Sequence, residues 1–191
     1  MSRKIMSRGF AEAIFIVVVL SLSSAAQAAD MRLTSAAVQD GKMLSPRFSY
    51  NQMGCTGQDI SPDLAWSGAP AATKSFAVTL FDPDARSGKG WWHWLAFNIP
   101  ATTAQLHEGA GRGKSRAMPQ GAVQSVTDFG VAGYDGPCPP PGSGVHHYVF
   151  TVYALDVDKA PLGADAAPAA VNAFLHQHAL ASAKLTGLFQ R

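Results

Sequence analysis

Two carboxylates and a histidine stand close together in the sequence, and such groups can hold an anion, bind a metal or run acid–base chemistry. Asp82 and Asp84 follow the apolar run Ser75–Phe81, and His93 opens the next apolar stretch. Both alternating sets of residues in Ser75–Phe81 are mostly apolar, which predicts a buried strand. Pro83 must end that strand or force a bulge, because proline cannot donate to a sheet ladder. The charge of Asp82 then needs a partner, and His93 is a reasonable candidate.

A second polar group opens the predicted strand Val145–Val157. His146 and Tyr148 are two residues apart, so they point to the same face of that strand. A stiff loop rich in proline and glycine precedes them, and polar groups at a strand end beside such a loop commonly line a pocket. The convergent set comprises Asp82, Asp84, His93, His146 and Tyr148, framed by Pro139 and Pro140.

Three chemistries are open to this set. Histidines, a tyrosine hydroxyl and loop N–H groups could hold a phosphate or carboxylate, with Asp82 orienting a histidine. Two histidines and a carboxylate are also the ligand set of a facial metal triad. Hydrolysis is the weakest interpretation, because the chain lacks a Gly-x-Ser-x-Gly elbow. A buried Asp–His pair that only satisfies a strand end is the structural alternative, and residue types alone do not separate a pocket from a metal site.

The first 28 residues have the pattern of a cleaved secretory signal. A basic start precedes the apolar run Ala13–Leu20, and Ala26–Ala28 fits a small-x-small cleavage site. The apolar run is shorter than the about 20 residues of a spanning helix. We therefore expect export to a periplasm or outside the cell, with no stable membrane span after cleavage.

Removing that segment changes the charge balance. The whole chain has 15 basic and 13 acidic residues, and residues 29–191 hold 12 of each. A neutral mature chain gives no electrostatic case for nucleic-acid binding. Its length fits one compact domain, 29–191.

The two cysteines, Cys55 and Cys138, both lie in the mature part. An even count in an exported chain predicts a disulfide, and two free buried thiols are the alternative. Because the bridge would close a long loop, the loop-entropy model assigns it roughly 4–5 kcal/mol before strain.

Low charge content with many glycines and prolines predicts short strands and many turns. Further strands are expected at Met31–Val38, Pro46–Asn51 and Trp94–Ile99, and Leu64–Trp66 begins a short apolar piece. The alanine-rich segment Asp165–Leu185 predicts a C-terminal helix. Its histidines, His176 and His178, are two residues apart and point to different faces, so a metal site from this pair alone is not expected.

Several motifs together resemble the phosphatidylethanolamine-binding protein family, in particular its bacterial Raf-kinase-inhibitor-like branch. They are Asp82-Pro83-Asp84-Ala85, Trp92-His93-Trp94, Gly136-Pro137-Cys138-Pro139-Pro140 and Gly142-Ser143-Gly144-Val145-His146-His147-Tyr148. Ile60-Ser61-Pro62 with Trp66, and Tyr153-Ala154-Leu155-Asp156, add to the resemblance. It covers about residues 33–191.

The resemblance implies a mainly β fold, an antiparallel β-sandwich with helices near the C-terminus. It also implies a small rigid pocket at one end that takes phosphate or a phospholipid head group. By position, the pocket residues are Asp82, His93, His146 and Tyr148, with Pro140 on the rim. We add Asp84 and Trp92, from the same motifs, as candidate ligand-binding residues.

The expected protein is a non-enzymatic binder of small anionic or phosphorylated ligands, with no cofactor and no metal. The alternative is an interaction module that modulates a kinase, a protease or a host partner; a homodimer is left open. If His93 and His146 protonate, anion affinity should rise as pH falls through ~6.5. Two residues depart from the family pattern: Arg86 replaces a proline and could place a cation beside the pocket, and Asp59 replaces an asparagine.

Overall fold

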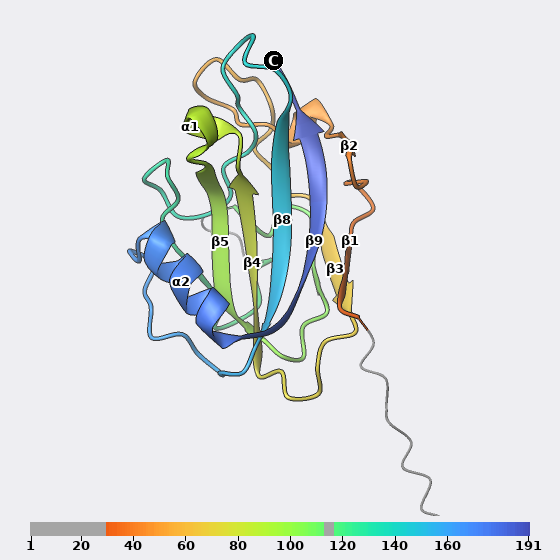
Figure 1. The fold of residues 1–191 in the computed structure, drawn as a ribbon, viewed down its shortest axis with the longest axis vertical. Helices are drawn as coiled ribbons and strands as arrows, with labels where there is room; N and C mark the ends of the chain where they lie inside the picture. The colour runs from red at the N-terminus through yellow and green to blue at the C-terminus, as the bar shows by residue number, and fades with distance from the viewer. Residues whose placement is uncertain (1–29, 113–116) are drawn as a thin grey trace, which may run out of the picture.

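The computed structural model describes residues 30–112 and 117–191, so the expected signal segment lies outside the described residues. The described chain is mainly β (Figure 1). Its strands are β1 (Arg32–Thr34), β2 (Lys42–Met43), β3 (Leu64–Ser67), β4 (Ser75–Asp82), β5 (Trp91–Pro100), β6 (Gln105–Leu106), β7 (Val123–Gln124), β8 (His146–Leu155) and β9 (Ala179–Phe189). Its helices are η1 (Pro46–Phe48), α1 (Ala85–Gly88) and α2 (Pro168–His178). None of the helices in these two ranges is long and apolar enough to cross a membrane.

The strands form two sheets. The larger has the order β2-β9-β8-β4-β5-β7, and the smaller has the order β1-β3-β6. All these pairings are antiparallel except that of β2 with β9. The two sheets share a core in which Trp66 of β3 packs on Phe76 of β4, with ring centres 5.3 Å apart. The predicted fold class, a mainly antiparallel two-sheet β protein, is confirmed.

Strand β4 lies at the centre of the larger sheet, between β5 and β8. Val78 and Leu80 face the shared core, whereas Ala77 on the other face packs with Val171 and Leu175 of α2. Burial on both faces explains why apolar residues occupy both alternating positions of this strand, as the sequence predicts. The sheet can therefore deliver side chains from the end of β4 to either face.

The predicted helix Asp165–Leu185 is correct only in its first part. α2 ends at His178, and the chain continues directly into β9. Ala181, Ala183 and Leu185 also fit a period of two, and β9 pairs with β8 along its length, with Ala183 opposite Val152. Tertiary pairing outweighs the helix propensity of these alanines.

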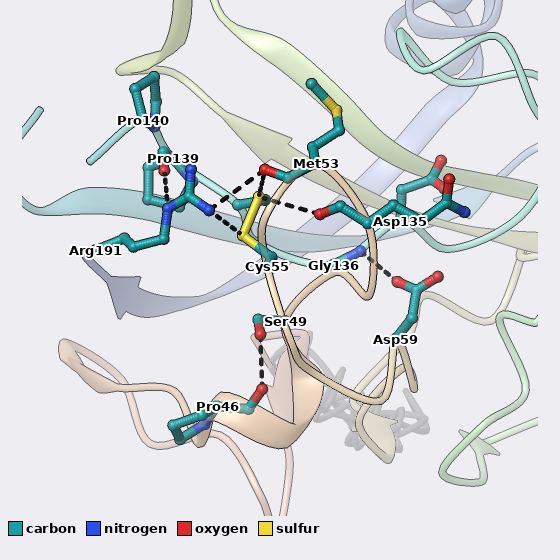
Figure 2. Close-up of a disulfide and its surroundings, with 12 residues drawn as sticks. Pro46, Ser49, Met53, Cys55, Asp59, Asp135, Gly136, Pro139, Pro140 and Arg191 are labelled. Carbon is teal, nitrogen blue, oxygen red and sulfur yellow. Dashed lines mark hydrogen bonds between the residues drawn. A yellow bond between two sulfur atoms is a disulfide. The ribbon is translucent and has the colours of Figure 1, made fainter.

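The predicted strand Pro46–Asn51 is also wrong, because residues 46–48 form the 3-10 turn η1. Ser49 Oγ donates to the Pro46 carbonyl at 2.7 Å (Figure 2). Such a local side-chain bond offers the backbone an alternative to a sheet ladder.

The predicted disulfide joins Cys55 to Cys138. It ties the loop after η1 to the proline-rich loop before β8, two segments separated by 83 residues. Figure 2 shows Arg191 beside the bridge, with Nε donating to the Pro139 carbonyl at 3.1 Å. The loop that leads into β8 is thus held by both a covalent bond and the side chain of Arg191.

Candidate functional site

A cavity of about 440 Å³ lies where β4 ends and β5 and β8 begin, and we call it the strand-end cavity. Its lining residues are Met53, Asp82, Asp84, Ala85, Arg86, Ser87, Trp91, His93, Phe129, Cys138, Pro139, Pro140, Ser143, His146 and Tyr148. Six of the seven residues predicted to bind ligand are among them, so the structure brings these six together. That they bind a ligand remains a prediction.

Asp82 is buried at the end of β4, and all its contacts serve to hold its charge. Oδ1 accepts hydrogen bonds from the backbone N–H groups of Asp84 and Ala85, at 2.9 and 3.2 Å. Oδ2 lies 2.7 Å from Nδ1 of His146. Because a carboxylate can only accept, Nδ1 carries the hydrogen and donates it. The partner of Asp82 is therefore His146, and the suggestion that His93 pairs with it is wrong.

The second ring nitrogen of His146 lies 3.0 Å from Ser143 Oγ. The order carboxylate, imidazole and hydroxyl is that of a serine hydrolase relay, which the sequence did not indicate. Here, however, Ser143 Oγ donates to the Pro140 carbonyl at 2.8 Å. Ser143 has a single hydroxyl proton, and the Pro140 carbonyl competes with the imidazole for it. In this arrangement the Asp82 carboxylate orients His146, and the Ser143 hydroxyl is engaged by the Pro140 carbonyl.

His93 is also buried, but its environment differs from that of His146. Its Nδ1 lies 2.7 Å from the Asp135 carbonyl, to which it donates. Burial lowers the pKa of His93 to about 4, although the Asp135 carbonyl and the Asp82 charge act in the opposite direction. His93 is therefore neutral at physiological pH, and the expectation that it gains charge near neutrality is wrong. Its remaining nitrogen can only accept a hydrogen bond.

Two buried donors at the cavity make no hydrogen bond of full geometry in the described part of the chain. They are the hydroxyl of Tyr148 and the ring N–H of Trp91. Burial, then the Asp82 charge and a hydrogen-bonding interaction with the Asp82 side chain, raise the pKa of Tyr148, so its hydroxyl keeps its proton and has the Asp82 carboxylate within reach. Buried polar groups nearly always have a partner, so an unpaired one needs an explanation.

Asp84 and the proline loop form the rim. Asp84 Oδ2 accepts from the backbone N–H of His147 at 2.7 Å and from its Nδ1 at 2.9 Å. Burial acts to raise the pKa of Asp84, but these hydrogen bonds outweigh it and the pKa is lowered. Asp84 is therefore ionised and occupied by His147, while Pro140 is exposed at the edge.

Trp92 is the one predicted residue that the structure places elsewhere. It pairs in register with Phe81, and the two rings pack with centres 4.4 Å apart. Both lie on the opposite face of the larger sheet, in a second hollow that we call the outer groove. The groove is lined by Thr79, Phe81, Pro83, Trp92, Val149, Thr151, Tyr153, Asn172, His176 and Lys184. Trp91, opposite Asp82 in the register, takes the position at the strand-end cavity that we expected for Trp92.

The two departures from the family pattern have different positions. Arg86 lines the cavity, and its guanidinium carbon lies 5.4 Å from the centre of the Trp91 ring. Asp59 is absent from the lining and instead accepts from the backbone N–H of Gly136 at 2.8 Å (Figure 2). It stands behind the loop and acts on Asp135: burial, together with the Asp59 charge, raises the pKa of Asp135 to about 6, although a bond from Thr127 opposes the rise.

The described residues contain no group of three or more histidine, cysteine, aspartate or glutamate side chains arranged to hold a metal ion. At the cavity, each histidine already uses Nδ1 for a protein acceptor, and Asp82 uses both oxygens. The set of residues that fits a facial triad by type is therefore committed to other contacts.

Comparison with known proteins agrees with the sequence motifs and the two-sheet fold. The family model for the phosphatidylethanolamine-binding protein matches residues 34–190. This chain belongs to the phosphatidylethanolamine-binding protein family.

Two proteins of Escherichia coli are among those to which the chain is similar. UPF0098 protein YbhB of Escherichia coli K12 is 49% identical over 159 residues, which cover 83% of this chain and 99% of YbhB. UPF0098 protein YbcL of the same strain is 43% identical over 173 residues, or 91% of this chain and 94% of YbcL. The crystal structure of E. coli YbcL matches with a TM-score of 0.83 at 44% identity, covering 85% of this chain and 99% of YbcL's. The bacterial branch of the phosphatidylethanolamine-binding protein family is thus the one to which the chain is similar.

Proposed function

We propose that this protein binds small anionic or phosphorylated ligands in the strand-end cavity and catalyses no reaction of its own. The observation that carries the proposal is the pair of buried donors at the cavity, the Tyr148 hydroxyl and the Trp91 ring N–H, neither of which makes a hydrogen bond of full geometry in the described residues. Among those residues, the Tyr148 hydroxyl, which keeps its proton, has only the side chain of Asp82, already bonded to three other donors, as its side-chain acceptor. An unpaired buried donor costs free energy of about 1–3 kcal/mol, which an acceptor on a ligand would recover. Phosphate and carboxylate oxygens are such acceptors.

The two carboxylates that line the cavity do not exclude a bound anion, because hydrogen-bond donors of the protein already contact both of them. Three donors contact the Asp82 carboxylate and stabilise its charge. His147 donates two hydrogen bonds to Oδ2 of Asp84. Arg86 adds one permanent positive charge at the mouth. A hydrogen bond from a neutral donor to an ionised acceptor is stronger than one between neutral groups.

We further propose that residues 1–28 are a cleaved secretory signal and that residues 29–191 form one exported domain. The Cys55–Cys138 disulfide supports this compartment, because disulfides persist in oxidising environments. The protein would then work in the periplasm or outside the cell.

The test is calorimetric titration of residues 29–191 with inorganic phosphate and with phosphoethanolamine. We expect saturable binding, and Tyr148→Phe should weaken it roughly ten- to hundredfold, the value of a hydrogen bond to a charged group. Tyr134→Phe is the matched control, because its hydroxyl donates to the Phe48 carbonyl at 2.9 Å and lies outside the cavity lining. Absence of binding by the unmodified protein, or an unchanged affinity in Tyr148→Phe, would contradict the proposal.

A second candidate is an interaction module that receives a protein partner at the same end. The observation in its favour is Met53, an apolar rim residue with 73% of its surface exposed. Met53→Ser should then abolish partner binding, whereas Tyr148→Phe should leave it intact, because a broad interface depends on its apolar anchors. Loss of small-anion binding in Tyr148→Phe alone favours the first proposal.

A further inference from the structure

The segment between β4 and β5 has an unusual backbone for its sequence. Arg86 and Ser87, at φ 52° and 57°, both have left-handed conformations within α1. Such conformations are unfavourable for residues with a Cβ atom, and two in succession are rarer still. Strained residues persist where the surrounding structure holds them, and they cluster at ligand sites. Hydrogen bonds from the N–H groups of Lys89 and Gly90 back to Ala85 fix this turn.

The strained turn places the Arg86 side chain over an aromatic ring at the cavity mouth. Its guanidinium carbon lies 5.4 Å from the centre of the Trp91 ring, and Trp91 itself lines the cavity. Cation–π stacking of this kind orients the planar group and leaves its N–H edge free to bind. The backbone and the ring together give an exposed arginine a defined position.

Arg86 forms no ion pair within the described part of the chain. The nearest acidic residue in sequence is Asp84, whose Oδ2 is occupied by two donors of His147. Of the other titratable groups lining the cavity, Asp82 is paired with His146, and His93 is neutral. Arg86 is therefore the one lining cation that no described carboxylate neutralises, and it lies at the mouth while Tyr148 lies at the buried end.

We propose that Arg86 is a specificity-determining residue that makes this cavity select phosphate monoesters over phosphate diesters; the inference rests on the proposed binding function. A monoester has three unesterified oxygens, so one can accept from the Tyr148 hydroxyl while two accept from the guanidinium fork. A diester has only two, and its second substituent must occupy one of these positions. Above a pH of about 6 the monoester also carries a second negative charge, which a fixed guanidinium favours.

The experiment is calorimetric titration at pH 7.5 of residues 29–191 with methyl phosphate and with dimethyl phosphate. We expect the unmodified protein to bind methyl phosphate about tenfold more tightly than dimethyl phosphate, on the scale of one charge-assisted bidentate contact. Arg86→Gln should remove most of this preference by weakening methyl phosphate about tenfold and dimethyl phosphate less than about threefold. Arg86→Lys should keep part of the preference, because it keeps the charge and loses the fork.

Lys89→Gln is the matched control. Lys89 is an exposed cation on the same turn and is absent from the cavity lining. The inference would be overturned if Arg86→Gln and Lys89→Gln weakened the binding of both esters to the same extent. That result would mean that the positive charges of the loop attract any anion and that Arg86 has no specific role. An unchanged preference in Arg86→Gln would also overturn it and leave the proposed binding function standing. If the unmodified protein binds neither ester, both proposals fail together.

Discussion

The strand-end cavity and the outer groove have nearly the same volume, about 440 Å³ each, and share walls from β4, β5 and β8. Neighbouring residues supply them. Asp82 faces the cavity and Phe81 the groove, and Trp91 and Trp92 divide in the same way across the larger sheet. The two hollows therefore differ little in size or scaffold.

They differ in the state of their polar groups. In the groove, Tyr153 hydrogen-bonds with the side chains of Thr79 and Thr151, although burial still raises its pKa. In the cavity, the Tyr148 hydroxyl interacts with the Asp82 carboxylate, which is one member of a buried ionisable pair, and makes no hydrogen bond of full geometry within the described residues. The proposed binding site is therefore distinguished from the groove by its buried ionisable pair and not by its volume.

The largest effect should come from removing a buried partner. His146→Ala leaves the Asp82 charge buried without its imidazole, which should lower the free energy of unfolding by about 3–5 kcal/mol. It should also abolish phosphate binding. In the groove, His176→Ala removes an exposed imidazole and should change stability by less than about 0.5 kcal/mol. Chemical denaturation and calorimetry on the two variants test the contrast, and equal effects would contradict it.

The next largest effect concerns the disulfide-linked proline loop, which lines the cavity but not the groove. The double variant Cys55→Ser and Cys138→Ser should lose roughly 2–5 kcal/mol of unfolding free energy, because the unfolded chain is no longer cross-linked. Since Cys138 lines the cavity, phosphate affinity should fall as well. Urea denaturation gives the first quantity and titration the second. An affinity that survives in the folded variant would show that the proline loop holds its position without the bridge.

A third prediction uses pH. Burial lowers the pKa of His93 to about 4. As pH falls from 6.5 toward 4, His93 is therefore protonated in the unfolded state but not in the folded state, and the stability of the protein falls. The pKa of Asp135 is raised to about 6, chiefly by burial, so the folded state takes up its proton first and stability rises over pH 6 to 4. In the unmodified protein these two contributions largely cancel.

Asp135→Asn should separate them. The amide keeps an oxygen for the Thr127 hydroxyl, which donates to Asp135 at 2.6 Å, and it removes the buried charge. The variant should be more stable than the unmodified protein by roughly 2–3 kcal/mol at pH 7, and this advantage should vanish by pH 4. Denaturant midpoints measured from pH 7 to 4 supply the test. A difference that does not change with pH would assign the effect to packing.

The smallest contrast compares the tyrosine of each hollow. Tyr153→Phe in the groove leaves Thr79 and Thr151 without a hydroxyl partner and should cost about 1 kcal/mol of stability. Tyr148→Phe in the cavity removes a donor that makes no hydrogen bond of full geometry within the described residues, so it should cost less stability than Tyr153→Phe. Melting temperatures of both variants decide this, and a loss in Tyr148→Phe equal to that in Tyr153→Phe would mean that the cavity hydroxyl is satisfied.

The sequence predicts the strands that build the cavity more reliably than the contacts within it. Apolar residues on both faces locate β4, and spacing by two places His146 and Tyr148 on one face, because each signal is local to a single strand. The pairing of Asp82 with His146 depends on the register of β4 against β8, which no local pattern contains. The choice of His93 as its partner was wrong for that reason.

Strand parity could have corrected another error. Since His93 faces the cavity, a period of two along β5 selects Trp91 and excludes Trp92. The family motif, which contains Trp92, hid this signal. The end of α2 at His178 could not be predicted from the local sequence. The alanines of β9 favour a helix, and they form a strand only because they pair with the edge of β8. The left-handed conformations of Arg86 and Ser87 were likewise not predicted, because Gly88 and Gly90 later in the same turn are the residues that sequence reasoning would assign to positive φ.

The position of β9 in the sheet has a consequence for how the chain folds. β2 joins the larger sheet only through β9, with Lys42 opposite Gly187 and Met43 opposite Leu188. A contact between segments so distant in sequence forms slowly, because closing the long loop between them first costs conformational entropy. We expect the hairpin of β4 and β5 and its partner β8 to assemble early. The edge of the sheet formed by β2 can therefore be completed only after β9 has paired with β8.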